Sequence, residues 1–371
     1  MYAADIRNSQ TQTGLAQAEA QNAERCTRSR MAEKWIRRKG SKSSGFRYSG
    51  ADGARIRDSK VLERIDTLRI PPAWRDVHIS ANPRAAIQVW GFDARGRKQY
   101  RYHTRAVEKG QLRKYYRVRQ MALELPRLRS KLFGDFERRD FSRERICAGI
   151  VLLIGHAFFR IGSDKYEKEN NTFGITTIRK SHVFIDGETV IFEYKGKRSI
   201  QHRQVVTDPA LARFIADLLE PPGRRLFRYK RGRKWIDVNA REVNEYIEEL
   251  AGFPYTAKDF RTWGGSLRAA TVLADLETAP TENARKKNVL TAVRVVAADL
   301  GNTPAICRKS YVHPIILTRY LRNGATISIP KRPRSRPTRV SHTPEEKALI
   351  AFLDEYFPER RKERRAADDE G

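Results

Sequence analysis

The 371-residue sequence has few cysteines and no long apolar segment. Cys26, Cys147 and Cys307 lie far apart and share no paired spacing, which argues for a reducing compartment and against a disulfide framework or a zinc knuckle. No stretch reaches the roughly eighteen consecutive apolar residues of a transmembrane helix. Residues 1–30 lack the apolar core of a secretory signal, so we expect a cytoplasmic protein associated with the nucleoid and not with a membrane.

Motifs for nucleotide-driven and metal-dependent chemistry are also missing. No glycine-rich Walker loop is present, so the sequence shows no cradle for a nucleotide phosphate. The HExxH and CxxC patterns do not occur, and the seven histidines are scattered. The acidic residues do not cluster as in a two-metal nuclease, although distant carboxylates can converge in a fold. The sequence therefore predicts neither a metal nor another cofactor.

Acidic residues are scarce relative to basic ones. The 74 Lys and Arg residues exceed the 44 Asp and Glu residues by 30 charges, and the pI is about 10.4. Basic side chains that neutralise phosphates release condensed counterions and so gain affinity. Nucleic acid is therefore the leading candidate partner. A basic protein of the ribosome or of a membrane surface is an alternative that charge alone does not separate.

Composition and periodicity divide the chain into four segments and indicate an α+β fold. Residues 1–30, rich in Gln, Ala and Asn, are interpreted as a disordered tail or the product of a misassigned start codon. We expect a small mixed β domain over 31–125 and a mainly helical domain with one short sheet over 126–325. Residues 326–371 are interpreted as a flexible basic tail with one short helix near 345–356.

Local patterns place several elements within these segments. Alternating apolar residues flank the turn-like run 93–96, which predicts a pair of strands there, and Asp186-Gly187 predicts a hairpin over 183–194. Residues 145–160 are apolar enough for a mostly buried helix ending at Arg160. Further helices are expected over 60–70, 208–219, 239–250, 258–276 and 282–300.

The residues that remain for chemistry are Arg, Lys and Tyr in separated motifs. Arg160 ends the buried helix, where packing would hold its guanidinium rigidly enough to suit a phosphate. Lys197 follows the hairpin next to a glycine, and Arg261 lies near the start of a helix. The segment Gly301–Pro304 ends one helix and starts another, and Tyr311 follows a few turns later.

Taken in this order, the motifs resemble the poxvirus-like branch of the type IB DNA topoisomerases, specifically its bacterial members. The resemblance runs from about Ile70 to about Tyr320. Upstream, Ile70–Trp74 and Gly96–His103 are similar to the family's amino-terminal DNA clamp. Downstream, the Arg261 segment and Gly301–Pro314 are similar to its catalytic core. Five separated motifs in the family order form a specific signal that none of them forms alone.

The resemblance implies the topoisomerase IB and tyrosine recombinase fold, and an enzyme that relaxes supercoiled duplex DNA without ATP or metal. Tyr311 would attack a phosphodiester, leaving a 3′-phosphotyrosyl link and a free 5′-hydroxyl. Two arginines would stabilise the transition state, lysines would protonate the leaving oxygen, and Asn302, a histidine in viral members, would orient the phosphate. The implied catalytic residues are Arg160, Lys197, Lys258, Arg261, Asn302 and Tyr311.

DNA contacts are implied for two stretches. Residues 97–102 interleave basic and aromatic side chains, which suit phosphates and base edges, although an ordinary amphipathic edge strand would look the same. His313, two residues after the tyrosine, is interpreted as a structural or phosphate-contacting residue and not as a proton carrier. The implied DNA-binding residues are Arg97, Lys98, Gln99, Tyr100, Tyr102, Lys165 and Tyr166.

Two other functions remain open at this point. A tyrosine recombinase uses the same catalytic residue types but exchanges strands within a multimer, whereas we expect a monomer whose two lobes close around a duplex. The clamp-like residues 70–103 favour the topoisomerase. An architectural DNA-binding protein without activity is the second alternative, and the intact catalytic set disfavours it.

Overall fold

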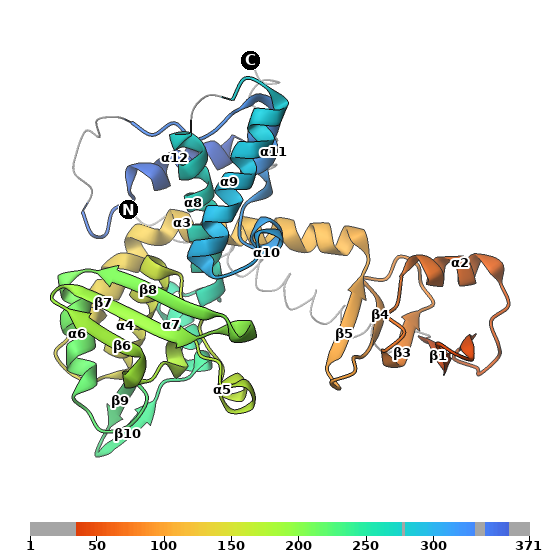
Figure 1. Ribbon diagram of the computed structural model, residues 1–371, viewed down its shortest axis with the longest axis horizontal. Helices are drawn as coiled ribbons and strands as arrows, with labels where there is room; N and C mark the ends of the chain where they lie inside the picture. Colours follow the sequence, from red (N-terminus) through yellow and green to blue (C-terminus); the bar gives the residue numbers. More distant parts are fainter. Residues whose placement is uncertain (1–34, 277–278, 331–337, 356–371) are drawn as a thin grey trace, which may run out of the picture. The chain divides into compact units, whose positions relative to one another are not determined.

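The computed structural model describes residues 35–276, 279–330 and 338–355. The chain divides into two compact units between Arg113 and Lys114, inside helix α3 (Thr104–Phe136) (Figure 1). The tail expected over residues 1–30 lies outside the described residues. Within the described ranges, no helix combines the length and the apolar character needed to cross a membrane.

The first unit is an antiparallel sheet with one helix. The five strands run in the order β2-β1-β3-β4-β5, and Ile65 of the helix packs with Ile36, Val77, Ile79 and Val89 in the core. The helix, expected over 60–70, ends at Thr67. The elements are β1 (Trp35–Ser41), β2 (Gly45–Ser49), α2 (Ser59–Thr67), β3 (Arg75–Ser80), β4 (Ile87–Phe92) and β5 (Lys98–Tyr102).

The strand pair expected around residues 93–96 is the β4–β5 hairpin. The Gly96 amide donates to the Asp93 carbonyl at 2.9 Å, and Gly96 has a φ of +71°, a conformation in which glycine carries no steric cost. Trp90 pairs with Tyr100 across the ladder. Because β5 is the edge strand of the sheet, one side of its backbone has no neighbouring strand among the described residues.

Helix α3 was not expected from the sequence. Its 33 residues bury Tyr115, Val118, Met121 and Leu125 at helical spacing despite an internal Pro126. Many arginines and lysines lie between these apolar positions, so the apolar face of the helix is hard to recognise in the sequence. The proline also argues against a continuous helix. The two units consequently separate before Lys114, earlier than the domain boundary expected at residue 125.

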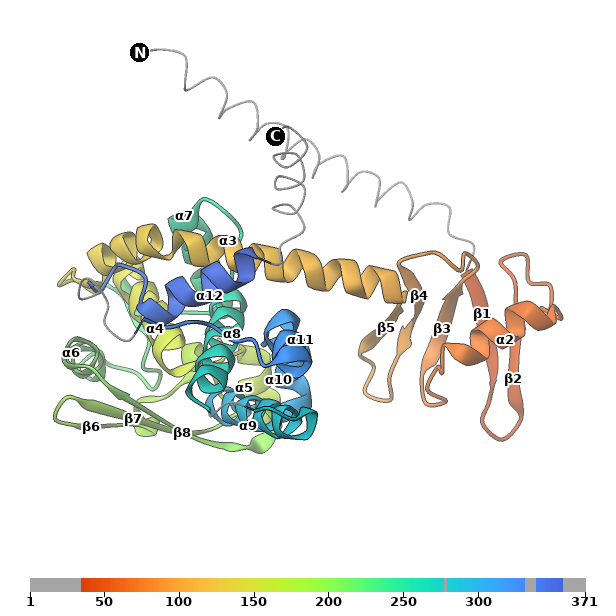
Figure 2. The ribbon, with the colours of Figure 1, turned by 90° about the horizontal axis from the view of Figure 1, so that it is seen from above.

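The second unit is mainly helical. Its three-stranded antiparallel sheet has the order β6-β7-β8, and α4 and α6 pack against it (Figure 2). The elements are α4 (Arg143–Ala157), α5 (Asp164–Asn170), β6 (Val183–Asp186), β7 (Thr189–Lys195), β8 (Gln201–Thr207), α6 (Pro209–Leu219), β9 (Arg228–Arg231), β10 (Lys234–Asp237), α7 (Ala240–Ala251), α8 (Ala257–Asp275), α9 (Glu282–Leu300), α10 (Pro304–Ser310), α11 (Pro314–Asn323) and α12 (Pro344–Asp354).

Most of the expected elements of this unit are present. The hairpin turn at Gly187 joins β6 to β7, and the Asn239 side chain accepts hydrogen bonds from the amides of Arg241 and Glu242 at the start of α7. Helix α9 ends at Gly301, whose φ is +59°. The small β9–β10 hairpin was not expected.

The expectation for Arg160 was wrong in one respect: the residue does not end a helix. Helix α4 stops at Ala157, and Phe158 adopts a left-handed conformation with φ of +53°. Phe159 is fully buried, and the Arg160 carbonyl accepts from the Ile175 amide at 2.7 Å. Tertiary contacts of the chain after the helix therefore hold Arg160 in place.

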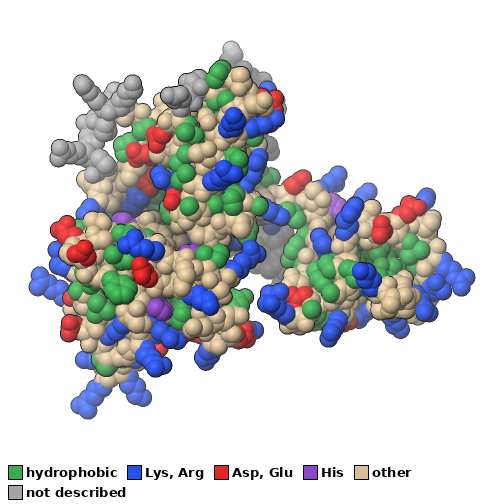
Figure 3. All heavy atoms as spheres, in the orientation of Figure 1, with side chains coloured by type: hydrophobic (Ala, Val, Ile, Leu, Met, Phe, Trp, Pro, Cys, Tyr) green, Lys and Arg blue, Asp and Glu red, His purple; other side chains and the backbone are tan. Residues whose placement is uncertain are grey.

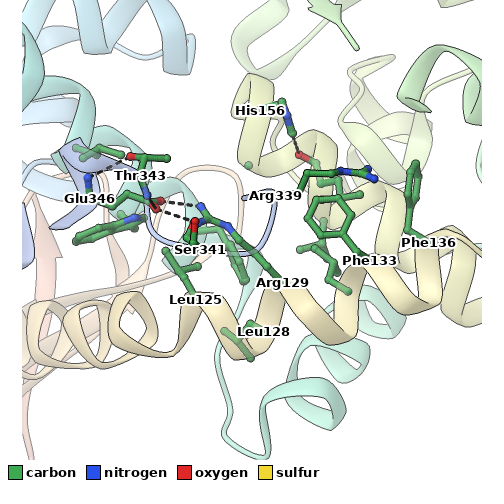
Figure 4. A pocket seen from close by; sticks show the side chains of 18 of the residues that line it. Leu125, Leu128, Arg129, Phe133, Phe136, His156, Arg339, Ser341, Thr343 and Glu346 are labelled. Carbon is green, nitrogen blue, oxygen red and sulfur yellow. Dashed lines mark hydrogen bonds and ion pairs between the residues drawn. The ribbon is translucent and has the colours of Figure 1, made fainter. Parts of the chain in front are cut away.

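The expectation of a flexible tail from residue 326 is wrong for residues 338–355, whereas 331–337 and 356–371 lie outside the described residues. Helix α12 buries Leu349 and Leu353 in the core of the second unit. Arg129 donates two hydrogen bonds to the Glu346 carboxylate, at 2.9 and 2.7 Å, and one to the Ser341 carbonyl (Figure 4). Apolar burial and this ion pair fasten the segment to α3.

The Arg129–Glu346 pair predicts a stability defect. Glu346 is 3% exposed, so Glu346→Gln leaves the partly buried Arg129 guanidinium without a counter-charge and should lower the free energy of unfolding by about 2 kcal/mol. Denaturant unfolding measures the change. Glu345→Gln is the matched control, because Glu345 forms no ion pair within the described residues. Equal stability of the two variants would contradict the role given to the pair.

Candidate phosphate-binding site

The turn between α9 and α10 brings the two predicted arginines together. The Arg160 Nη2 atom donates to the Gly301 carbonyl at 2.6 Å and to Asn302 Oδ1 at 2.5 Å. Arg261 Nη2 donates to the Leu300 carbonyl at 3.0 Å. Carbonyls at a helix C-terminus lack intrahelical partners, and the end of α9 offers them to guanidinium groups from two other segments.

The guanidinium group of Arg261 also lies over the Tyr311 ring. The tyrosine ring centroid is 5.4 Å from Arg261 Cζ. Gly265, one turn further along α8, permits this approach, because a Cβ atom there would lie 3.0 Å from the Tyr311 carbonyl oxygen. The structure thus brings together Arg160, Arg261, Asn302 and Tyr311, four of the six predicted catalytic residues.

Several buried donors of this cluster have no hydrogen-bond partner. Within the described part of the chain, eight buried side-chain polar atoms are unpartnered, and four of them belong to this site: Arg261 Nε and Nη1, Asn302 Nδ2 and His202 Nε2. Buried polar atoms are normally satisfied, so each exception calls for an explanation. A bound anion would satisfy the arginine and asparagine donors.

The electrostatic surroundings agree with an anion site. Arg261 is 3% exposed, and burial lowers its pKa; the Tyr311 phenol opposes that shift and the Arg160 charge adds to it. Neither guanidinium is paired with a carboxylate within the described ranges, whereas the buried Arg145 is paired with Asp217 at 2.5 Å. Two adjacent cations without a counter-ion are costly unless an anion binds.

The two predicted lysines are not joined to this cluster by a hydrogen bond within the described residues. Lys197 is exposed in the short helical turn Lys197–Ser199 between β7 and β8, where the adjacent Arg198 has a φ of +64°. Lys258 is exposed in the first turn of α8, three residues before Arg261, and so lies near the same helix face.

His202 is a site residue that the sequence analysis missed. Its ring is stacked on Tyr194, with centroids 5.4 Å apart, and fits against two glycines, where Cβ atoms would lie 2.3 Å from the ring at Gly196 and 2.1 Å at Gly301. Burial, followed by the charges of Arg160 and Arg261, lowers its pKa. Nothing in the strand pattern distinguishes this histidine, because its contacts come from distant loops.

A cavity of about 790 Å³ opens beside the site and is lined by His202, Gly301 and Asn302, among other residues of β8 and α9. A second cavity, of about 550 Å³, lies between α3, α4, α8 and residues 338–346 (Figure 4). Its lining is mainly apolar and includes none of the six predicted catalytic residues.

His313 has a structural role, one of the two roles expected for it. Its Nδ1 atom accepts from the Ile315 amide at 3.2 Å and caps α11, and its ring lies 4.5 Å from the Tyr115 ring. Burial, with a smaller effect of the Lys114 charge, lowers its pKa to about 3. At neutral pH the imidazole is therefore neutral and already used as a cap.

The predicted DNA-binding residues lie on β5, on the turn before it and on α5. Tyr100 and Tyr102 are 41% and 53% exposed and stack at 5.9 Å. Lys98 Nζ lies 3.9 Å from the Trp90 ring centroid. Both Arg97 and Gln99 bind the Asp93 carboxylate, at 2.8 and 3.0 Å, so Gln99 is already engaged within the protein.

On α5, Lys165 and Tyr166 are exposed. Lys165 Nζ lies 3.8 Å from Glu169 Oε1, a surface pair that contributes little to stability. Both side chains can therefore reach a ligand at a small cost in stability.

Within residues 35–276, 279–330 and 338–355, no group of three or more His, Cys, Asp or Glu side chains is arranged to hold a metal ion.

The burial of His313 predicts a pH-dependent stability. The pKa in the folded protein is about 3, below the ordinary value of about 6.5, so at acidic pH the unfolded chain binds a proton that the folded chain does not. Stability present above pH 6.5 should fall with decreasing pH by about 1.4 kcal/mol per unit from this residue. His313→Asn keeps a capping side chain and should reduce that slope in unfolding measurements between pH 4 and 7. An unchanged slope would contradict the assignment.

Comparison with known proteins identifies the family. A family model described as the catalytic core of eukaryotic DNA topoisomerase I matches residues 98–327. A second, described as the N-terminal domain of bacterial DNA topoisomerase IB, matches residues 45–93 and supports the bacterial branch. The core match covers more than half of the chain and includes all six predicted catalytic residues.

Named relatives agree with these matches. DNA topoisomerase 1B of Acanthamoeba polyphaga mimivirus is 32% identical over 273 residues, which cover 71% of this chain and 81% of the viral protein. DNA topoisomerase 1B of vaccinia virus (strain Copenhagen) is 24% identical over 275 residues, 70% of this chain and 82% of the relative. The resemblance and the fold class predicted from the motifs are confirmed, and the chain belongs to the type IB DNA topoisomerase family.

Proposed function

We propose that Tyr311 is the nucleophile of DNA strand cleavage and that Arg160, Arg261 and Asn302 bind the scissile phosphate. The observation that carries this proposal is the cluster of unpartnered donors beside the phenol: Arg261 Nε and Nη1 and Asn302 Nδ2. Asn302 Oδ1 is already occupied by Arg160, which directs the amide nitrogen of Asn302 to another acceptor. A non-bridging phosphate oxygen supplies one.

The chemistry exchanges one phosphoester for another. The Tyr311 oxygen bonds to phosphorus and gives up its proton, while the bond from phosphorus to the 5′-oxygen breaks and that oxygen gains a proton. The product is a 3′-phosphotyrosyl link and a free 5′-hydroxyl. Attack by the 5′-hydroxyl reverses each change, so the strand is resealed with no net consumption of bond energy. Rotation of the free end between these steps relaxes the duplex.

The arginines act on the charge of the transition state. Negative charge builds on the non-bridging oxygens, where paired guanidinium donors stabilise it more strongly than lysines would. Donors fixed by the α9 carbonyls need no reorganisation during the reaction. Each is worth a few kcal/mol, on the order of a hundredfold or more in rate.

A proton for the departing 5′-oxygen comes from Lys197 in this proposal, with Lys258 as the second donor. The Lys197 side chain is exposed and makes no hydrogen bond within the described residues, so its ammonium is available to a bound substrate. The preceding residue, Gly196, lies against the His202 ring, which also lies against Gly301, and this supports an approach of Lys197 to the phosphate.

The substrate in this proposal is duplex DNA, bound by a monomer in the cytoplasm. The 30-charge surplus supports a polyanionic partner, and Lys and Arg side chains are spread over the visible face of each unit (Figure 3). Exposed Tyr100, Tyr102, Lys165 and Tyr166 can contact it directly. Arg97 and Lys98 add phosphate contacts, and Gln99 would have to leave Asp93 to read a base.

Relaxation should require the Tyr311 hydroxyl and neither a metal ion nor ATP. Supercoiled plasmid should be relaxed in the presence of EDTA and without ATP, and Tyr311→Phe should abolish relaxation because no oxygen remains to bond phosphorus. Agarose gels follow relaxation, and duplex affinity of the variant, measured in parallel, should change less than twofold. Relaxation by Tyr311→Phe would remove the residue from this role.

A change of leaving group distinguishes the role proposed for Lys197 from the role proposed for the two arginines. Once cleavage positions are mapped from covalent adducts, a duplex with sulfur in place of the bridging 5′-oxygen offers a leaving group that needs no proton. Lys197→Ala should lose at least a hundredfold in cleavage rate on the ordinary duplex and recover most of it on the sulfur substrate. Arg160→Ala and Arg261→Ala, the matched controls, should remain slow on both. Lack of recovery by Lys197→Ala would exclude it as the acid.

A further inference from the structure

The backbone around Tyr311 is held by side chains from two other helices. Helix α10 ends at Ser310 and α11 begins at Pro314, so residues 311–313 form the link between them. Tyr311 has φ of −126° and ψ of −18°, outside the helical range. A nucleophile on such a link depends on contacts from elsewhere for its position.

Three successive carbonyls of this segment each accept one side-chain hydrogen bond. Lys114 Nζ donates to the Ser310 carbonyl at 3.2 Å. Ser266 Oγ donates to the Tyr311 carbonyl at 3.1 Å, and Tyr115 Oη donates to the Val312 carbonyl at 2.6 Å. The donors come from α3 and α8, which lie nearly 200 and about 45 residues away in the chain.

Ser266 binds both peptide groups that flank Val312. Its hydroxyl also accepts from the His313 amide at 3.0 Å, so one oxygen bridges the carbonyl of residue 311 and the amide of residue 313. Ser266 is 2% exposed and Tyr115 is 5% exposed, and both donors are therefore fixed by packing. Together with Gly265, which lies against the same residue, they determine where the Tyr311 Cα atom sits.

We infer that Lys114, Tyr115 and Ser266 are positioning residues that hold Tyr311 for attack on phosphorus. The inference rests on the proposed role of Tyr311. It gives α3 a part in positioning the nucleophile, which the sequence of α3 does not indicate. Each hydrogen bond is worth only about 1 kcal/mol in stability. Their effect on rate is larger, because a displacement of about 1 Å in a reacting group costs on the order of a hundredfold.

The charge of Lys114 adds a readout that a purely structural contact would not have. Its Nζ atom lies 3.8 Å from the Tyr115 ring centroid. Burial, followed by the Lys258 charge, lowers its pKa to about 8, and Asp259 opposes the shift; the nearby His313 is neutral at this pH. Below pH 8 the Lys114 amine is charged, which strengthens its hydrogen bond to the Ser310 carbonyl. Above pH 8 the amine loses its proton and charge, so this hydrogen bond holds the segment less firmly.

The test measures cleavage and binding separately in the full-length protein. Tyr115→Phe and Ser266→Ala each remove one hydroxyl and should slow covalent adduct formation at least tenfold, with duplex affinity changed less than twofold. Substitution of sulfur for the bridging 5′-oxygen should not restore the rate, because the nucleophile and not the leaving group is affected. Lys114→Met should flatten the pH dependence of cleavage near pH 8 on the sulfur substrate, where Lys197 is not needed.

Matched controls exist on the same helices. Tyr116→Phe removes a hydroxyl that accepts a hydrogen bond from Gln120 Nε2, one turn along α3, and Thr271→Val removes a hydroxyl that donates to the Leu267 carbonyl within α8. Both should cleave at nearly the wild-type rate.

Cleavage by Tyr115→Phe and Ser266→Ala within twofold of the controls would overturn the inference. Activity of Tyr311→Phe in the same assay would instead overturn the proposed function beneath it. Retained duplex binding shows that a slow variant is folded.

Discussion

The site depends on two arginines that donate to the same turn and pair with no carboxylate in the described part of the chain. Like charges in a low-dielectric environment repel each other and are costly to desolvate, yet Arg261 is 3% exposed, and both arginines donate to the turn at the end of α9. The carbonyls of Leu300 and Gly301, with the Asn302 side chain, offset part of that cost. The donors that these contacts leave unpartnered, Arg261 Nε and Nη1 and Asn302 Nδ2, suit an anion, whose charge would offset the rest of that cost.

Contacts of both arginines and of His202 therefore meet at the end of α9. Gly301 allows the chain to turn in a left-handed conformation, exposes the last helical carbonyls to both guanidinium groups and leaves room for the His202 ring. A side chain at this position would meet the ring and strain the backbone at once. Through the His202 ring, Gly301 is therefore packed against Gly196, which precedes Lys197 in the β7–β8 loop.

Tyr311 and the two arginines are held by different parts of the second unit. The arginines bind the end of α9, whereas the link carrying Tyr311 is bonded to α3 and α8. Helix α3 is itself fastened by the Arg129–Glu346 pair and by Arg119, which bonds Asp354 of α12. The relative positions of Tyr311 and the arginines consequently depend on packing well outside the motifs that carry them, which is a usual requirement for a precise site.

Taken alone, the sequence determined the family, the order of motifs, the β4–β5 and β6–β7 hairpins and most helices of the second unit, because turn residues, caps and apolar periodicity act over a few neighbouring positions. It did not reveal α3, whose apolar stripe is interrupted by basic residues and Pro126. Only the tertiary structure decided that Arg160 lies beyond its helix, that α12 is packed, and that His202 and Ser266 belong to the site. Those contacts join segments tens to hundreds of residues apart, and their partners are selected by packing in three dimensions, which no local pattern encodes.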